Sequence, residues 1–149
     1  MRRREFIALM GASITWPHAA RAQQAGRNYR LGCLLPLTRD APINVAFFDE
    51  LRCRGFIEGQ NLTVIYHAFA ANPDLLPDWA AELVKARVDV IATVGDLATR
   101  SAQQATKNIP ILAVTDDMIG AGLVNSLARP NGNTTGFSIL ATELDGKRQ

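Results

Sequence analysis

The fold of this chain is decided by the stretch Val88-Asp89-Val90-Ile91-Ala92-Thr93-Val94-Gly95. Its first seven residues are almost uniformly apolar, and a glycine closes the run. A strand that is apolar on both of its faces is typical of a parallel sheet covered by helices on both sides. The stretch therefore predicts an inner strand of an α/β protein.

The segments on either side of this strand repeat the same alternation. Helical periodicity is present before it, in residues 77–87, and after it, in residues 96–107. Further strands are predicted at 29–35, 61–66, 109–114 and 134–140, and further helices at 43–54 and 119–128. The order βαβαβαβαβ predicts an α/β fold with a doubly wound parallel sheet of about five strands and helices on both faces.

The first 22 residues have the three parts of a secretory signal peptide. Arg2-Arg3-Arg4 precedes an apolar run from Phe6 to Trp16, and Ala20-Arg21-Ala22 supplies a cleavage site. About ten apolar residues rise only about 15 Å as a helix, half of a bilayer core, which argues against a permanent anchor. Arg3-Arg4-Glu5-Phe6-Ile7 fits a twin-arginine export signal, and an ordinary basic start of a general secretion signal fits equally well. We expect a periplasmic protein cleaved after Ala22.

Removal of the leader changes the charge of the chain. The whole sequence has 16 basic and 14 acidic residues, and residues 1–22 hold four arginines and one glutamate, which leaves 12 basic and 13 acidic residues. A net charge of −1 without a basic tract argues against a nucleic-acid partner. Residues 23–149 have the length of a single domain. Cys53 is expected on the solvent face of its helix, away from Cys33 in the strand below, so we expect two free thiols.

Four short segments follow the predicted strands, where open α/β sheets bind their ligands. They are residues 36–38, 69–70, 95–96 and 115–117. Gly95 lets a ligand approach the start of the next helix, whose N–H groups suit a carboxylate or phosphate. Asp96 is expected to cap that helix, in competition with such a ligand. Asp117 can equally receive a ligand ammonium group or cap the segment after it.

The residues give little support to an enzyme. His67 is the single histidine outside the leader, and it has no glycine-framed serine to act with. No His or Cys joins the adjacent carboxylates Asp116 and Asp117 at metal-ligand spacing. Gly120-Ala121-Gly122 begins like a dinucleotide fingerprint, but Asn125 replaces the third glycine. We expect no catalytic residue, no metal and no cofactor.

Several stretches carry a resemblance to a known family. They are residues 55–62, 80–84 and 88–91, and most specifically 120–130 with Gly132-Asn133-Thr134-Thr135-Gly136-Phe137. Together with the leader they resemble the substrate-binding proteins of bacterial ABC importers related to the tryptophan/tyrosine-binding group. The resemblance implies a type I periplasmic-binding fold, in which two α/β lobes close over a small ligand such as an amino acid. It also implies ABC permease subunits in the inner membrane as partners.

The resemblance also implies which residues bind the ligand. In such proteins the first lobe contributes the loops after strands one, three and four. Carried over by position, the binding residues are Leu37, Thr38, Thr93, Gly95, Asp96, Thr115, Asp116 and Asp117. The chain departs from the family at Asp96, where a hydroxyl residue is common, and at Met118, where proline commonly follows the aspartate. The ligand therefore cannot be copied from relatives.

Residues 143–149 resemble the start of the helix that leads into the second lobe, and we expect residues 23–149 to be the N-terminal lobe alone, with the second lobe absent. One lobe leaves half of the ligand in water, which weakens binding about tenfold for every 1.4 kcal/mol of lost contact. Three hypotheses follow: a substrate-binding component, a truncated fragment of one without activity, and an exported α/β enzyme with an unrecognised site.

Overall fold

A single sheet of five parallel strands organises the chain, and a computed structural model describes residues 26–128 and 132–139 of it. The strand order across the sheet is β2-β1-β3-β4-β5. In chain order the strands are β1 (Tyr29–Leu35), β2 (Leu62–Ala68), β3 (Val90–Val94), β4 (Ile111–Thr115) and β5 (Thr134–Ser138). Every neighbouring pair is parallel, so all five carboxyl ends lie on one edge of the sheet.

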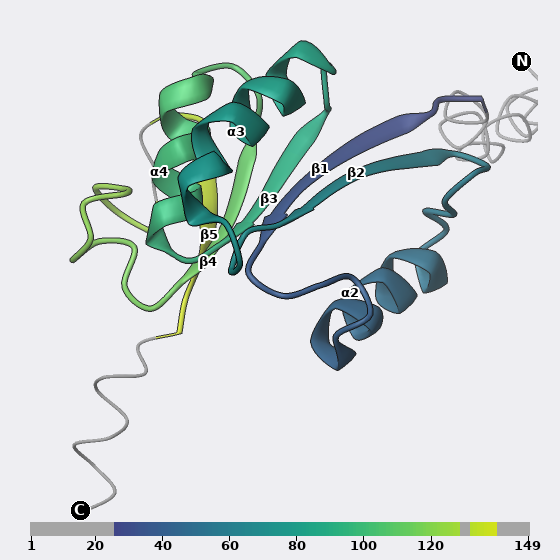
Figure 1. Ribbon diagram of the computed structural model, residues 1–149, viewed down its shortest axis with the longest axis horizontal. Coiled ribbons are helices and arrows are strands. Elements are labelled where there is room, and N and C mark those ends of the chain that lie inside the picture. The colour runs from purple at the N-terminus through teal and green to yellow at the C-terminus, as the bar shows by residue number, and fades with distance from the viewer. Residues whose placement is uncertain (1–25, 129–131, 140–149) are drawn as a thin grey trace, which may run out of the picture.

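The helices cover the two faces of the sheet unequally (Figure 1). They are α2 (Pro42–Cys53), α3 (Leu76–Lys85) and α4 (Asp96–Ala105), with a short 3-10 helix η1 (Pro73–Leu75) before α3. On one face α3 and α4 pack over β1, β3 and β4 through Leu83, Ala98 and Ile111. On the other face α2 packs through Phe47, Phe48 and Leu51 over Leu31, Cys33 and Leu35. The predicted α/β class, the five parallel strands and the helices on both faces are thus confirmed.

The predicted helix at residues 119–128 is wrong. The described connection between β4 and β5 is built from turns and contains no helix. Asp117 accepts hydrogen bonds from the N–H groups of Ile119 and Gly120 through its carboxylate, at 3.1 and 2.9 Å, and Gly122 then adopts a positive φ of 67°. A left-handed residue interrupts a right-handed helix, so the segment makes a single turn and stops.

The strands that the sequence predicts are largely buried on the face that packs under α3 and α4. Leu34, Ile91 and Ile111 have no exposed surface, and each comes from a different strand. Burial of a side chain of this size stabilises the folded state by about 1.5–3 kcal/mol, before the entropic cost of ordering it. Across the part of the chain that the structure describes, none of the helices combines the length and the apolar character that a membrane span requires.

Both cysteines are free thiols, as predicted. Cys33 has no exposed surface and lies beneath α2, whereas Cys53 is exposed at the end of that helix. Burial raises the pKa of the Cys33 thiol to about 12. Since the thiolate is the reactive form, the two cysteines differ in both access and ionisation.

Alkylation measures this difference directly. We expect iodoacetamide at mildly alkaline pH to modify Cys53 and to leave Cys33 intact in the folded chain, because Cys33 is buried and stays protonated. Peptide mass spectrometry reports the site of modification. Denaturant added beforehand should expose both thiols equally. Modification of Cys33 at the rate of Cys53 without denaturant would contradict the packing of α2 on β1.

Strand β5 depends on a close approach between backbones. A Cβ atom on Gly136 would lie 1.8 Å from the carbonyl oxygen of Ala113 in β4. We therefore expect Gly136→Ala to separate β5 from β4 and to lower the free energy of unfolding by about 1–3 kcal/mol, the usual cost of overpacking. Thr135→Ala is the matched control, since Thr135 is exposed on the same strand and should change stability by less than about 0.5 kcal/mol. Urea denaturation followed by circular dichroism compares the two.

Candidate functional site

The order of the strands reverses between β1 and β3. From β1 the chain moves outward to β2, and it then returns past β1 to β3 and continues to β4. The loops that leave β1 and β3 therefore depart in opposite directions and leave a crevice at the carboxyl edge, the usual ligand position in open α/β sheets. The loop after β4 lies next to that of β3 because these strands pair directly. The three loops expected to bind a ligand are thus neighbours at one edge.

The loop after β1 is held in place by the buried amide of Asn44. This side chain in α2 donates hydrogen bonds to the carbonyl oxygen of Thr38 at 2.8 Å and to the hydroxyl of Tyr66 at 2.9 Å. The Tyr66 hydroxyl in turn donates to the carbonyl oxygen of Leu37 at 2.5 Å. The backbone of Leu37 and Thr38 is therefore fixed, while both side chains stay exposed at the carboxyl edge.

Arg39 ties the same loop to the rest of the fold. Its guanidinium pairs with Glu58 and lies 4.4 Å from the centre of the Phe48 ring. Two contacts on different segments restrict the loop, although each exposed ion pair contributes little energy on its own. Asn44, Tyr66 and Arg39 were absent from the sequence predictions. The one signal in the sequence was a polar asparagine next to apolar residues of α2. Its contacts could not be predicted, because its partners lie up to 22 residues away in the sequence.

The loop after β3 is a single residue with an unusual backbone. Gly95 has φ 87° and ψ 158°, a combination essentially confined to glycine, and it forms the N-cap of α4. A Cβ atom at Gly95 would meet nothing within 4 Å, so the backbone is open to an approaching molecule. Asp96 is the first residue of α4, and the cap makes no side-chain hydrogen bond. The expectation that Asp96 caps the helix is therefore wrong, because its position lies one residue too far along the chain.

Thr93 lies below the edge rather than on it. The residue is 1 % exposed, and its hydroxyl is 2.8 Å from the hydroxyl of Thr99 in α4. The Thr99 hydroxyl donates to the carbonyl oxygen of Gly95 at 2.8 Å, so Thr93 supplies the proton of the bond between the two threonines. Through Thr99, Thr93 therefore helps to hold the turn at Gly95 in place.

The loop after β4 carries three of the predicted residues in three different environments. Thr115 is 2 % exposed, and among the described residues its hydroxyl oxygen has no hydrogen-bond partner. Asp116 is exposed. Asp117 is half-buried and uses Oδ1 for the turn at Ile119 and Gly120, so it caps a turn and not a helix. Asp116 is the carboxylate of this loop that faces solvent.

The electrostatics of the edge combine negative side chains with a positive helix end. Asp40, Asp96 and Asp116 are exposed and follow β1, β3 and β4 respectively. The Thr38 hydroxyl donates to Asp40 and holds the pKa of that carboxyl below its usual range, so Asp40 is ionised at neutral pH. The first turn of α4 presents free backbone N–H groups with a partial positive charge. An ammonium group and a carboxylate can therefore be bound side by side.

The described residues hold no group of three or more His, Cys, Asp or Glu side chains that could bind a metal ion. His67 is the penultimate residue of β2, and its ring stacks on that of Trp79 with 5.0 Å between the ring centres. The arrangement at the edge provides hydrogen-bond donors, carboxylates and backbone access. It matches the class of α/β proteins that bind a small molecule at the strand-order switch point.

The family follows from sequence comparison. The family model of the ABC transporter substrate binding proteins matches residues 41–146, more than two thirds of the chain. The chain therefore belongs to the ABC transporter substrate-binding protein family. The predicted resemblance is confirmed.

Individual relatives agree with this assignment. A tyrosine-binding protein of Clostridioides difficile (strain R20291) is 33 % identical over 94 residues, which span 62 % of this chain and 27 % of the relative. The ligand-free, open structure of CD0873, a substrate-binding protein with adhesive properties from Clostridium difficile, superposes with a TM-score of 0.66 at 26 % identity. An ABC domain from Streptococcus pneumonia in complex with L-Trp gives the same two values.

The comparison structures are longer than the chain. The first two superpositions cover 74 % of this chain but 38 % of each neighbour. A conserved domain protein from Vibrio cholerae superposes with a TM-score of 0.70 at 26 % identity. This superposition covers 82 % of this chain and 43 % of that protein. The chain thus spans less than half the length of the solved structures it matches.

We expect Asn44→Ala to release the loop after β1. The change leaves the Thr38 carbonyl and the Tyr66 hydroxyl without their buried donor, so the free energy of unfolding should fall by about 1–3 kcal/mol. Amide hydrogen exchange should accelerate first in residues 38–41. Asn28→Ala is the control, since it removes an exposed hydrogen bond to Thr63 and should have an effect below about 0.5 kcal/mol. Equal exchange in the loops of both variants would contradict the role of Asn44.

Gly95→Ala tests the backbone of the second loop. Because φ is 87° and ψ is 158°, an alanine here is strained, and we expect a loss of about 1–3 kcal/mol in the free energy of unfolding. Asp96→Ala, at the next position, keeps a helical conformation and should leave stability nearly unchanged. Thermal melts of both variants supply the comparison. A Gly95→Ala chain as stable as the parent would contradict the left-handed turn.

Proposed function

We propose that the chain binds a small molecule, an amino acid, at the carboxyl edge of its sheet, as the substrate-binding component of an ABC importer. The observation that carries the proposal is the meeting of three loops at the switch point, where exposed carboxylates lie beside the free N-terminus of α4. The zwitterion of an amino acid needs both kinds of group at once. The α4 N–H groups receive its carboxylate, and Asp116, with Asp96 on the neighbouring loop, receives its ammonium group.

The relatives support an amino acid as the substrate class. One is a tyrosine-binding protein, and another was solved with L-Trp. Asp96 and Met118 depart from the common pattern of the family, so we propose an amino-acid ligand without transferring either of these two ligands unchanged. Leu37, Thr38, Gly95, Asp96, Asp116 and Asp117 form the proposed contact surface, with Thr93 and Thr115 beneath it.

The same proposal places the protein in the periplasm. Residues 1–22, which lie outside the described residues, act as a cleaved leader, and residues 23–149 form the N-terminal lobe of the binding protein. Permease subunits in the inner membrane then receive the ligand, and the chain itself catalyses no reaction. A second lobe closes over the ligand in proteins of this kind by a hinge motion, and it supplies the remaining contacts.

Ligand analogues separate the two charges of the proposed site. We expect L-tryptophan or L-tyrosine to raise the melting temperature of the chain, while tryptamine, which lacks the carboxylate, and indole-3-propionate, which lacks the ammonium group, bind roughly 10- to 100-fold more weakly. Titration calorimetry measures the dissociation constants. No stabilisation by any amino acid would favour the truncated-fragment hypothesis.

Asp116→Asn provides the residue-level test. We expect it to weaken the amino acid about 10- to 100-fold, because it removes the charge that faces the ammonium group, and to leave indole-3-propionate binding unchanged. Asp89→Asn is the matched control, since Asp89 directly precedes β3 at the amino edge of the sheet, opposite the three loops. If Asp116→Asn binds the amino acid as tightly as the parent chain, the assignment of the ammonium site is wrong.

A further inference from the structure

Helix α4 carries a line of polar side chains that runs from the candidate site along the connection between β4 and β5. Asp96, Arg100 and Gln103 are spaced by four and three residues, so they lie on one side of the helix. Asp96 begins the helix at the carboxyl edge. Arg100 and Gln103 follow about one and two turns later, and both donate hydrogen bonds to the connection, which passes beside α4 (Figure 1). One helix therefore contacts both the site and the segment that follows Asp116.

The side-chain amide of Gln103 bridges two segments. Its nitrogen donates to the carbonyl oxygen of Leu123 at 2.8 Å and to the hydroxyl of Thr134 at 2.9 Å. Leu123 belongs to the connection, and Thr134 is the first residue of β5. Both acceptor residues are buried, so a lost donor there is not simply replaced by water. Gln103 thus joins α4, the connection and β5 at one point.

The guanidinium of Arg100 adds a second contact, one turn closer to the site. It donates to the carbonyl oxygen of Ala121. Because the positive φ of Gly122 interrupts the helical turn, the carbonyl groups of Ala121 and Leu123 cannot rely on a continuing helix for their donors. The two side chains of α4 therefore supply hydrogen bonds to a segment that does not form a helix of its own.

The connection closes on itself directly after Asp116. Met118 has no exposed surface, its N–H donates to the Ser138 hydroxyl of β5 at 3.0 Å, and its carbonyl oxygen accepts the N–H of Leu123 at 2.9 Å. Asp116 lies between this closed loop and the end of β4. A displacement at Leu123 is therefore transmitted through Met118 to the backbone of Asp116.

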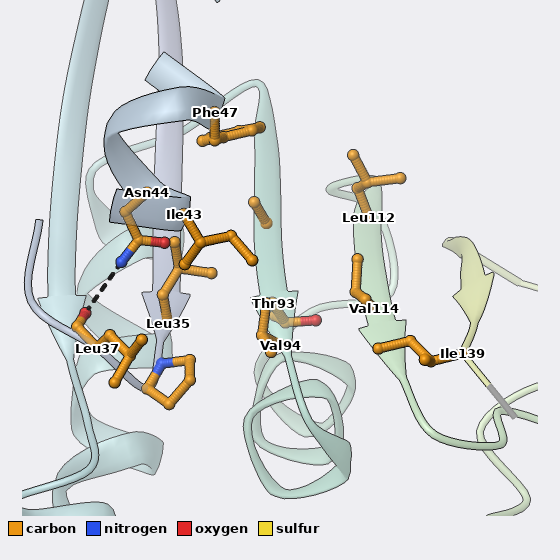
Figure 2. Close-up of a pocket in the computed structure, with 12 residues that line it drawn as sticks. Leu35, Leu37, Ile43, Asn44, Phe47, Thr93, Val94, Leu112, Val114 and Ile139 are labelled. Carbon is orange, nitrogen blue, oxygen red and sulfur yellow. Dashed lines mark hydrogen bonds between the residues drawn. The ribbon is translucent and has the colours of Figure 1, made fainter. Parts of the chain in front are cut away.

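The other two loops of the site are held by the same kind of contact. Figure 2 shows the Asn44 amide of α2 bonded to the carbonyl oxygen of Leu37 in the loop after β1. In the loop after β3, the Thr99 hydroxyl of α4 donates to the carbonyl oxygen of Gly95. In all three loops, a polar helix side chain bonds to the loop backbone and leaves the side chains of the loop free for other contacts.

We propose that Gln103, together with Arg100, positions Asp116 for the ammonium group of the ligand by tying the loop after β4 to α4. The inference rests on the proposed function, and it adds two positioning residues that act through Asp116. Since the N-terminus of the same helix receives the carboxylate of the ligand, α4 sets the spacing between the two charged groups of the site. A zwitterion needs that spacing, whereas a ligand with a carboxylate alone does not.

Gln103→Met tests the tie, because methionine has about the length of glutamine and suits a helix but carries no donor. We expect L-tryptophan to bind this variant about 3- to 10-fold more weakly, with the affinity for indole-3-propionate unchanged. Calorimetry on the full chain measures both dissociation constants, and amide hydrogen exchange in residues 117–124 should accelerate. Gln104→Met is the matched control, since Gln104 is the exposed neighbour on α4 and its replacement should change none of these quantities.

Arg100→Met gives a second variant, which decides the matter if Gln103→Met does not fold. Arg100 is exposed, so its replacement leaves the core intact. By charge alone, the loss of a cation favours the zwitterion over the anionic indole-3-propionate. We expect the ratio of the two dissociation constants to move against L-tryptophan instead, because Asp116 is displaced.

The ratio separates positioning from a purely structural role. A contact that only stabilises the fold lowers the melting temperature and leaves the ratio as it is in the parent chain. An unchanged ratio in the folded variants, or unchanged hydrogen exchange in residues 117–124, overturns the inference while the proposed function stands. A parent chain that does not bind L-tryptophan contradicts the proposed function itself, and the inference falls with it.

Discussion

The parallel arrangement of all five strands is the constraint on which the rest of this structure depends. A parallel pair cannot be joined by a tight hairpin, so every connection has to cross over one face of the sheet. Because such crossovers are right-handed, the direction in which the chain moves along the sheet decides which face a helix covers. The outward step from β1 to β2 places α2 on one face, and the return through β3 to β4 places α3 and α4 on the other.

The position of the candidate site follows from that path. The reversal of direction between β1 and β3 creates the crevice in which the loops at Thr38, Gly95 and Asp116 come together. Among the described residues, the same reversal leaves α2 as the one helix on its face, so β4 and β5 carry no helix there. A polar edge and an apolar face are thus two results of one topology. The edge suits a small zwitterion.

The sequence predicted the sheet because its strands are short apolar runs bounded by glycine and proline. Residues 88–94 are the clearest case, and β3 begins and ends within them. The helix expected at 119–128 failed because its apolar spacing could not reveal that the Asp117 carboxylate bonds to two nearby N–H groups. Local competition between a side chain and the backbone is a frequent reason for such errors.

Prediction of the candidate site had a similar limit. Topology alone located the three loops, and the structure places all three at one edge. Residue types could not show that Thr93 is buried against Thr99, or that Asn44 and Tyr66 hold the loop after β1, because these contacts depend on packing between segments distant in sequence. The proposed amino-acid ligand rests on two relatives, a tyrosine-binding protein and a structure solved with L-Trp, because geometry alone leaves the ligand at a small charged molecule.

The central claim is that an amino acid binds at the switch point of the sheet. The most direct measurement is a ¹H–¹⁵N correlation spectrum of the labelled chain during titration with L-tryptophan, which also detects weak binding. The account predicts that the amides of Thr38, Gly95, Asp96 and Asp116 shift together as ligand is added, with those of Leu112 and Phe137 unchanged. Shifts confined to residues outside the three loops, or no shifts at millimolar ligand, would contradict it.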